Sequence, residues 1–221
     1  RRMETRAAAA SDTRIFRREL GLVCGLYFIA AIYHSSWGLP NGNQTWAADS
    51  VAPMTPLAVA YKTFAENGFD SGYFYFKYPV GHQLLLAAAT APVVAIAYAR
   101  GDLSGISADY PFGFAQPEAY LAAMAMIARL LSALFATGII AMVGEIARRA
   151  HDRRAGVLAA LVAAGCYPLL FYAHTSNVET AFLFSAMLAL YGPIRGVEDG
   201  APTGLRLMGA AAAMAISTKE Q

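Results

Sequence analysis

The sequence predicts an all-α protein: a polytopic bundle of transmembrane helices with a long outer loop that carries surface helices. Of its 221 residues, 57% are hydrophobic and only 14% are charged, whereas a soluble domain has roughly 25% charged residues. The apolar residues gather in runs that approach or exceed the roughly 20 residues needed to cross a bilayer. The net charge of +2 is small, and without a basic stripe it argues against a nucleic-acid partner.

The candidate spans follow one another with polar turns between them. We place them at residues 20–37, 119–147, 155–173, 178–194 and 205–218. A shorter apolar run, 84–99, is interrupted by Pro92 and is ambiguous. The arginine-rich start of the chain is typical of a retained signal anchor, because no soluble domain follows a cleavage site. The chain stops just after an apolar stretch, so we expect residues 1–221 to be one incomplete transmembrane domain, the N-terminal part of a longer protein.

The distribution of arginines orients the predicted bundle, because short cytoplasmic loops carry an excess of Lys and Arg. If 84–99 does not cross, the cluster at 148–154 lies on the same side as the N-terminal arginines. If it crosses, that cluster moves to the outer side. We therefore expect 84–99 to lie on or dip into the outer leaflet. The protein is then a multi-pass protein with a cytoplasmic N-terminus, and we expect it in a bacterial inner membrane.

The outer segment 38–118 is where we expect function, because loops on a rigid scaffold carry binding and catalytic residues. A short amphipathic helix is predicted from 53 to 67, ending before Gly68. An aromatic run at 73–79 suits the depth of the membrane interface. Asp49 precedes both features and has two interpretations: a helix cap or solvated loop acid, or a catalytic carboxylate held just above the membrane.

Several short motifs follow one another along the chain in a particular order. They are Asp49-Ser50, Lys77-Tyr78-Pro79, Arg129-Leu130-Leu131-Ser132-Ala133-Leu134, His174-Thr175-Ser176-Asn177-Val178-Glu179 and Thr218-Lys219. The ordered set resembles the class-C glycosyltransferases, and most closely the protein O-mannosyltransferase and aminoarabinose-transferase group, which uses polyprenyl-phosphate sugars. Ser50 replaces the usual Glu of that group, which argues against a two-carboxylate metal site there. Val80 replaces a second Pro.

The resemblance implies a membrane glycosyltransferase that moves a sugar from a polyprenyl-phosphate donor to a hydroxyl of a glycan, lipid or protein acceptor on the periplasmic or lumenal side. In that reaction Asp49 is the base. Glu179 assists it, orients the acceptor or helps to hold a divalent cation. No cofactor is certain, and Mg²⁺ or Mn²⁺ is the candidate. The substrate-binding candidates, with cations that suit the departing phosphate, are Lys77, Tyr78, His82, Arg129 and Lys219.

Plainer roles remain open for these residues. Glu179 also suits the first turn of a helix, next to the positive end of the helix dipole. Lys77 can extend to lipid headgroups. His82 and His174 are expected as polar residues of the interface rather than metal ligands, since no ligand spacing surrounds them. Arg129 lies in an apolar run, which favours function or a buried pairing.

Two features away from the outer loop have structural interpretations. Glu145 lies near the cytoplasmic end of its span and is expected to pair with Arg148 or Arg149. Cys24 and Cys166 lie in apolar runs and are expected to be buried small hydrophobic residues rather than a disulfide or metal site.

The alternative function is a polytopic transporter or a lipid-handling membrane protein. Transporters tend to show internal repeats with prolines or glycines at matched positions, and no such repeat is apparent here. A purely structural membrane subunit would leave the long outer loop without a role.

Overall fold

The computed structural model describes residues 2–33, 35–39, 51–61, 79–105, 111–199 and 202–219. Within these ranges it contains eight helices and one isolated β-bridge, between Leu103 and Phe114. The predicted all-α fold is confirmed. The helices are α1 (Arg2–Ile32), α2 (Thr55–Tyr61), α3 (Gly81–Ala99), α4 (Pro117–Ala150), α5 (Arg153–Ala164), α6 (Tyr167–Ala173), α7 (Val178–Asp199) and α8 (Thr203–Thr218).

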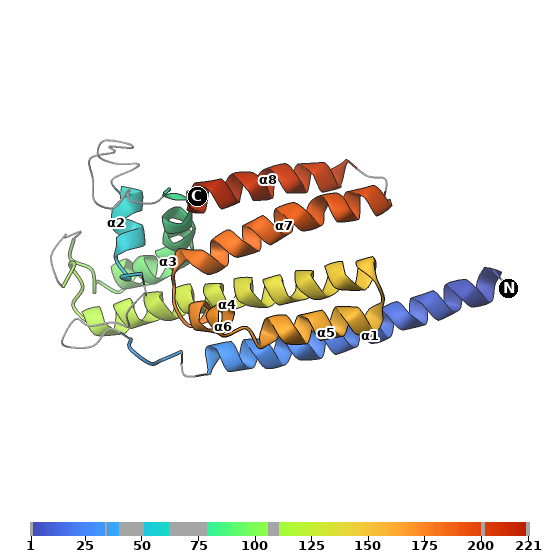
Figure 1. The fold of residues 1–221 in the computed structure, drawn as a ribbon. Helices are drawn as coiled ribbons and strands as arrows, with labels where there is room; N and C mark the ends of the chain where they lie inside the picture. The colour runs from blue at the N-terminus through green and yellow to red at the C-terminus, as the bar shows by residue number, and fades with distance from the viewer. Residues whose placement is uncertain are drawn as a thin grey trace.

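Most of the helices run along one common direction and form a bundle around α4 (Figure 1). The hairpin of α7 and α8 lies on one side of α4, and α1 and α5 lie together on the other. α2 and α3 cover one end of the bundle, and the N-terminal turns of α1 extend beyond the opposite end.

Small residues let the helices around α4 approach closely. Ala133 and Ala136 of α4 are fully buried, as is Ala160 of α5. A Cβ added to Gly156 of α5 would lie 2.8 Å from the carbonyl oxygen of Gly144 in α4. Close backbone approach through small residues is typical of helices that pack in a membrane, where burial from water does not drive association.

Large apolar side chains remain exposed on several helices of the bundle. In a soluble protein such a surface would be a liability, whereas lipid accommodates it. By length and composition, α3 and α4 could each cross a membrane, and so could the bent pair of α5 and α6 if it is one span, among the residues that the structure describes. The exposed residues include Leu22, Leu26, Ile29, Leu130, Leu134, Leu158, Leu161, Val162, Leu190 and Ile216.

The third expected span, 155–173, is not one straight helix. α5 ends at Ala164, α6 begins at Tyr167, and the two axes bend by 62°. Pro168 explains the break, because its ring would clash with the carbonyl of residue 164 inside a continuous helix. In the first turn of the new helix the missing N–H costs nothing.

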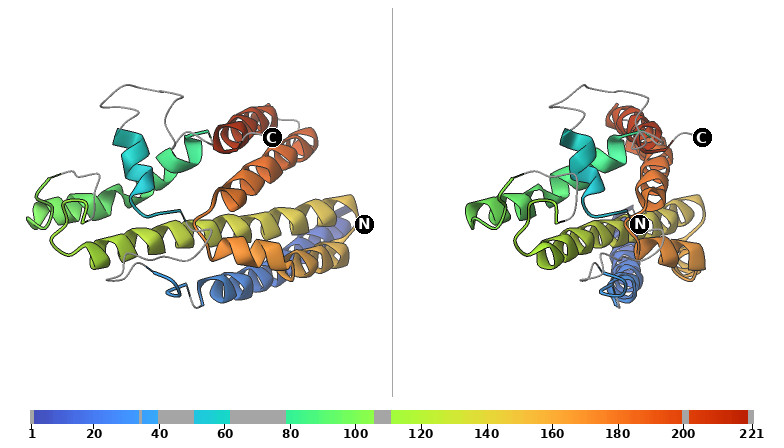
Figure 2. Two further views of the ribbon diagram at one scale, coloured as in Figure 1. Left: turned by 60° about the vertical axis from the view of Figure 1, so that its left-hand side comes forward. Right: turned by 90° about the vertical axis from the view of Figure 1, so that its left-hand side faces the viewer.

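α3 corresponds to the ambiguous apolar run, and Pro92 lies inside it without ending it. The helix is inclined steeply to the bundle and lies across its end (Figure 2). Its length alone would allow a crossing, so the prediction that 84–99 stays on the outer side remains a prediction. Of the surface helix expected at 53–67, α2 accounts for Thr55–Tyr61, and residues 62–67 lie outside the described ranges.

Candidate functional site

Four segments that are distant in sequence meet at the end of the bundle covered by α3. The first is the chain just before α2, where the amide of Val51 donates to Ser176 Oγ over 2.9 Å. The second is the first turn of α3, where His82 Nε2 lies 3.0 Å from the carbonyl oxygen of Ser176. The turn between α6 and α7 supplies Ser176 itself. The fourth is the end of α8, because a Cβ added to Gly81 would lie 2.5 Å from Ser217 O.

Glu179 and Lys219 form an ion pair at this junction. Glu179 lies in the first turn of α7, and Lys219 is the residue directly after α8. Lys219 Nζ lies 3.4 Å from Glu179 Oε1, and the two side chains are 26% and 28% exposed. The second oxygen, Glu179 Oε2, is buried and has no hydrogen-bond partner among the described residues. Since a buried unpaired acceptor costs about 1–3 kcal/mol, this oxygen is suited to a ligand.

His82 is as deeply buried as Arg129, with 3% of its surface exposed. Burial lowers the pKa of its imidazole, against the opposing effects of the hydrogen bond with Ser176 and the charge of Glu179. The neutral ring donates from Nε2, because the carbonyl of Ser176 can only accept. Nδ1 is then an acceptor, and it is buried without a partner in the described part of the chain. A hydroxyl group would suit this position.

Arg129 is buried within α4 and is bound by backbone rather than by a carboxylate. Its Nη1 donates to the carbonyls of Ser35 and Trp37, the latter over 2.6 Å, and its Nη2 donates to Gly38 over 3.3 Å. The guanidinium therefore ties α4 to the chain that leaves α1. Within the described ranges it makes no hydrogen bond or ion pair with Glu179 or Lys219. The sequence left two roles open for Arg129, a functional one and a buried pairing. This geometry favours the buried pairing.

Three of the predicted site residues, Asp49, Lys77 and Tyr78, lie outside the described residues. The predictions about them therefore stay predictions. The structure does place their described neighbours in sequence. Val51 follows Asp49 by two positions and is bound to Ser176.

Ser176 belongs to this junction but was not among the site residues predicted from the sequence. It is 1% exposed, and its hydroxyl and carbonyl contact two different segments. Its motif was identified, but no local signal separates it from Thr175 or Asn177. His174, two residues earlier, lies 3.2 Å from the carbonyl of Tyr33 through Nε2 and 2.8 Å from that of Leu170 through Nδ1. It therefore acts here as a polar residue between α6 and α1.

The described residues contain no group of three or more His, Cys, Asp or Glu side chains that could hold a metal ion. A divalent cation thus stays a prediction that depends on residues beyond the described ranges. The cysteines are both free; Cys24 is partly buried and Cys166 is exposed. The expectation that Cys166 is buried was wrong, because the break between α5 and α6 turns it outward.

Residues 117–221, just under half of the chain, match the model of the dolichyl-phosphate-mannose-protein mannosyltransferase family. This match confirms the resemblance to class-C membrane glycosyltransferases of the mannosyltransferase type. The matched part contains Arg129, Glu179 and Lys219 and does not reach Asp49 or His82. No curated protein and no solved structure matches the chain significantly.

Proposed function

We propose that this mannosyltransferase-like protein moves a sugar from a polyprenyl-phosphate donor to an acceptor hydroxyl at the junction of α3, α7 and α8. The observation that carries the proposal is the pair of Glu179 and Lys219. It puts a carboxylate, one oxygen of which has no hydrogen-bond partner among the described residues, beside an ammonium group at the end of the bundle. In the expected topology this end faces the periplasm or lumen.

The reaction needs a base, a cation and an apolar surface for the isoprenoid tail. The acceptor oxygen forms a bond with the anomeric carbon, the bond from that carbon to the phosphate oxygen breaks, and its electron pair leaves with the phosphate. Lys219 is suited to stabilise the departing phosphate, because charge-assisted hydrogen bonds to phosphate are short and strong. Lys77 is the second candidate for the same task.

Asp49 is the proposed base, and it takes the proton of the acceptor hydroxyl. Support comes from Val51, whose amide and carbonyl both contact the hydroxyl of Ser176. Asp49 precedes Val51 by two positions in the sequence. Ser176 in turn precedes Glu179 by three positions. The two acids are therefore proposed to act at one junction.

The remaining candidates have binding or positioning roles in this proposal. Glu179 orients the acceptor or helps to hold a divalent cation through Oε2. His82 accepts a sugar hydroxyl at Nδ1. Arg129 acts as a positioning residue rather than a direct phosphate ligand, because its guanidinium is bound by three carbonyls. Tyr78 stays a candidate for stacking against the sugar.

A transporter or lipid-handling protein is the second candidate, and the match to a transferase family favours the first. The test is transfer of radiolabelled mannose from a synthetic polyprenyl-phosphate mannose by the full-length protein in nanodiscs. We expect Lys219→Ala to lower donor affinity about 10-fold or more, since a hydrogen bond to a charged group contributes roughly 1.5–3 kcal/mol. Arg206→Ala, at the other end of α8, is the matched control. Equal donor affinity in both variants would contradict the proposal.

A further inference from the structure

Buried polar atoms without a hydrogen-bond partner gather in the half of the bundle nearest the junction of α3, α7 and α8. Seven side-chain nitrogen or oxygen atoms are of this kind in the described part of the chain, and one of them, Tyr27 Oη, belongs to α1. The other six are atoms of His82, Gln83, Arg129, Ser132, Glu179 and Thr180. Because most buried polar groups in proteins bond to protein or to ordered water, this gathering indicates bound molecules.

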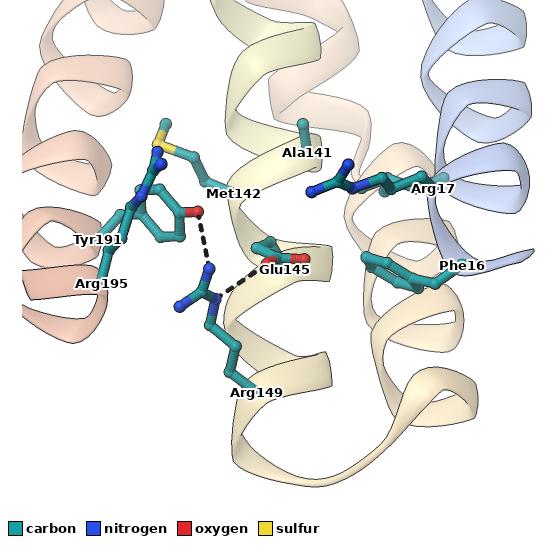
Figure 3. A pocket seen from close by; sticks show the side chains of 9 residues that line it. Phe16, Arg17, Ala141, Met142, Glu145, Arg149, Tyr191 and Arg195 are labelled. Atoms are coloured by element: carbon teal, nitrogen blue, oxygen red, sulfur yellow. Dashed lines mark hydrogen bonds and ion pairs between the residues drawn. The ribbon is translucent and has the colours of Figure 1, made fainter. Parts of the chain in front are cut away.

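The opposite end of the bundle differs in this respect. A cavity of about 370 Å³ opens there between α1, α4 and α7, and its polar side chains contact one another (Figure 3). Glu145 pairs with Arg149 at 2.9 Å and with Arg148 at 2.7 Å, so its expected pairing is confirmed. Arg149 Nη2 also donates to Tyr191 Oη over 3.5 Å. None of the residues that line this cavity is among those with a buried, unpartnered atom.

One face of α7 packs on α4. Arg149 Cζ of α4 lies 5.5 Å from the ring centroid of Tyr191, and seven positions earlier in α7 the ring of Phe184 lies 5.1 Å from that of Phe135. Residues three or four positions apart share a helix face, so Thr180, four positions before Phe184, faces α4 as well. The two helices run in the same direction (Figure 1). The turn of α7 before Phe184 therefore meets the turn of α4 before Phe135.

Ser132 and Arg129 belong to that part of α4. Ser132 precedes Phe135 by three positions, so with a rise of about 1.5 Å per residue it lies at nearly the same level as Thr180. Both residues are 1% exposed, and neither hydroxyl has a partner. Arg129, three positions before Ser132, is its neighbour on the helix surface. Its Nε is buried and unpartnered, although Nη1 and Nη2 donate to carbonyls.

We propose that a buried water molecule joins Arg129 Nε, Ser132 Oγ and Thr180 Oγ1, and that this bridge fixes the first turn of α7. Buried waters typically make about three hydrogen bonds to otherwise unpaired groups. The water accepts from the guanidinium N–H, and each hydroxyl can donate to it or accept from it. Thr180 directly follows Glu179, so the bridge positions the carboxylate that pairs with Lys219. This positioning role rests on the proposed function, whereas the water site does not.

Electron cryomicroscopy of the full-length wild type in nanodiscs, at a resolution that shows ordered water, tests the bridge directly. A density peak is expected about 2.7–3.2 Å from each of the three atoms. A direct hydrogen bond between Ser132 and Thr180, or an apolar side chain between them, would overturn the bridge.

Thermal unfolding of T180V, S132A and the double variant tests the bridge energetically. Each single change should lower the melting temperature by about 2–4 °C, and the double variant should lose less than the two losses added together, because the variants share one water. If the hydroxyls were unpaired in the native protein, each single change would raise the melting temperature, since a buried unsatisfied group would be removed. T90V is the matched control: Thr90 is also 1% exposed, but its hydroxyl donates to the carbonyl of Leu86 over 2.9 Å. Its effect should add to that of S132A.

The positioning role is tested by transfer kinetics. T180V should lower kcat about tenfold, with the KM for the donor changed much less, because a small misplacement of a catalytic group affects the chemical step. T180S, which keeps the hydroxyl, should restore kcat. An unchanged kcat in T180V would remove the positioning role. Absence of transfer by the wild type would contradict the proposed function alone, because the water density and the melting temperatures do not depend on activity.

Discussion

Lys219 Nζ lies 3.4 Å from Glu179 Oε1, across the junction between the end of α8 and the start of α7. The two residues are 40 positions apart and meet because α7 and α8 form an antiparallel hairpin. The pair combines an acid and a cation at the end of the bundle where Val51, His82 and Ser176 also converge.

The first prediction concerns the coupling of this pair. Because both side chains are partly exposed, we expect the ion pair itself to contribute only about 0–1 kcal/mol to stability. Glu179→Gln, Lys219→Met and the double variant should therefore unfold within a few degrees of the wild type, while transfer activity drops in each. Thermal unfolding in detergent and mannose transfer measure the two effects. A large loss of stability with intact activity would make the pair structural.

The second prediction concerns Asp49 as base. Asp49→Asn keeps size and hydrogen bonding but removes basicity, so turnover in the full-length protein should fall roughly 10²–10⁴-fold. Donor binding should survive, because the phosphate contacts are assigned to other residues. Single-turnover transfer and equilibrium binding of the donor separate the two. Turnover within a few-fold of wild type would reduce Asp49 to a cap or a loop acid.

The third prediction concerns Arg129, which holds the carbonyls of Ser35, Trp37 and Gly38. Arg129→Ala should destabilise the protein by about 1–3 kcal/mol for each carbonyl left buried and unpaired. Arg129→Lys should recover only part of this loss, because the lysine ammonium cannot reproduce the planar, forked N–H donors of the guanidinium. The exposed Arg154→Ala serves as control. If Arg129→Ala unfolds like the control but loses donor affinity, Arg129 is a phosphate ligand after all.

The fourth prediction concerns pH and His82. Burial keeps the pKa of His82 below its ordinary value of 6.5. The unfolded chain therefore binds a proton first as pH falls, and the folded protein loses stability from about pH 6.5 downward until the folded pKa is passed. His82→Gln retains a donor for the carbonyl of Ser176 but cannot titrate. Its melting temperature should depend less on pH between 7 and 5 than that of the wild type, and parallel curves would refute this role.

The fifth prediction concerns topology. Reporter fusions after Gly105 should indicate the outer side, and fusions after Arg154 the cytoplasmic side. This pattern follows if α3 lies across the end of the bundle without crossing and the arginine-rich turn after α4 stays inside. The reverse pattern would contradict this topology: because Val51 and His82 contact Ser176 at one end of the bundle, the whole bundle would then be inverted and the proposed active site would face the cytoplasm.

The sequence by itself determined the class of this protein and the positions of most of its helices. Apolar runs of sufficient length predict helices in lipid whatever surrounds them, since every backbone group must be paired within the segment. α4 covers the apolar run at 119–147, and α7 and α8 begin within two residues of the runs at 178–194 and 205–218. The pairing of Glu145 with Arg148 and Arg149 could likewise be predicted from the sequence, because residues three and four positions apart are neighbours on one helix face.

Only the tertiary structure decided which residues meet across the bundle. Ser176 contacts Val51 over 125 positions of sequence and His82 over 94, and Arg129 reaches Trp37 over 92. Backbone carbonyls are present at every residue, so no sequence pattern marks the ones that a buried arginine will find. Arg17, Arg149 and Arg195 likewise come together only because α1 and α7 pack on the same helix, α4. Contacts of this kind depend on helix packing, which the apolar pattern of each separate helix does not specify.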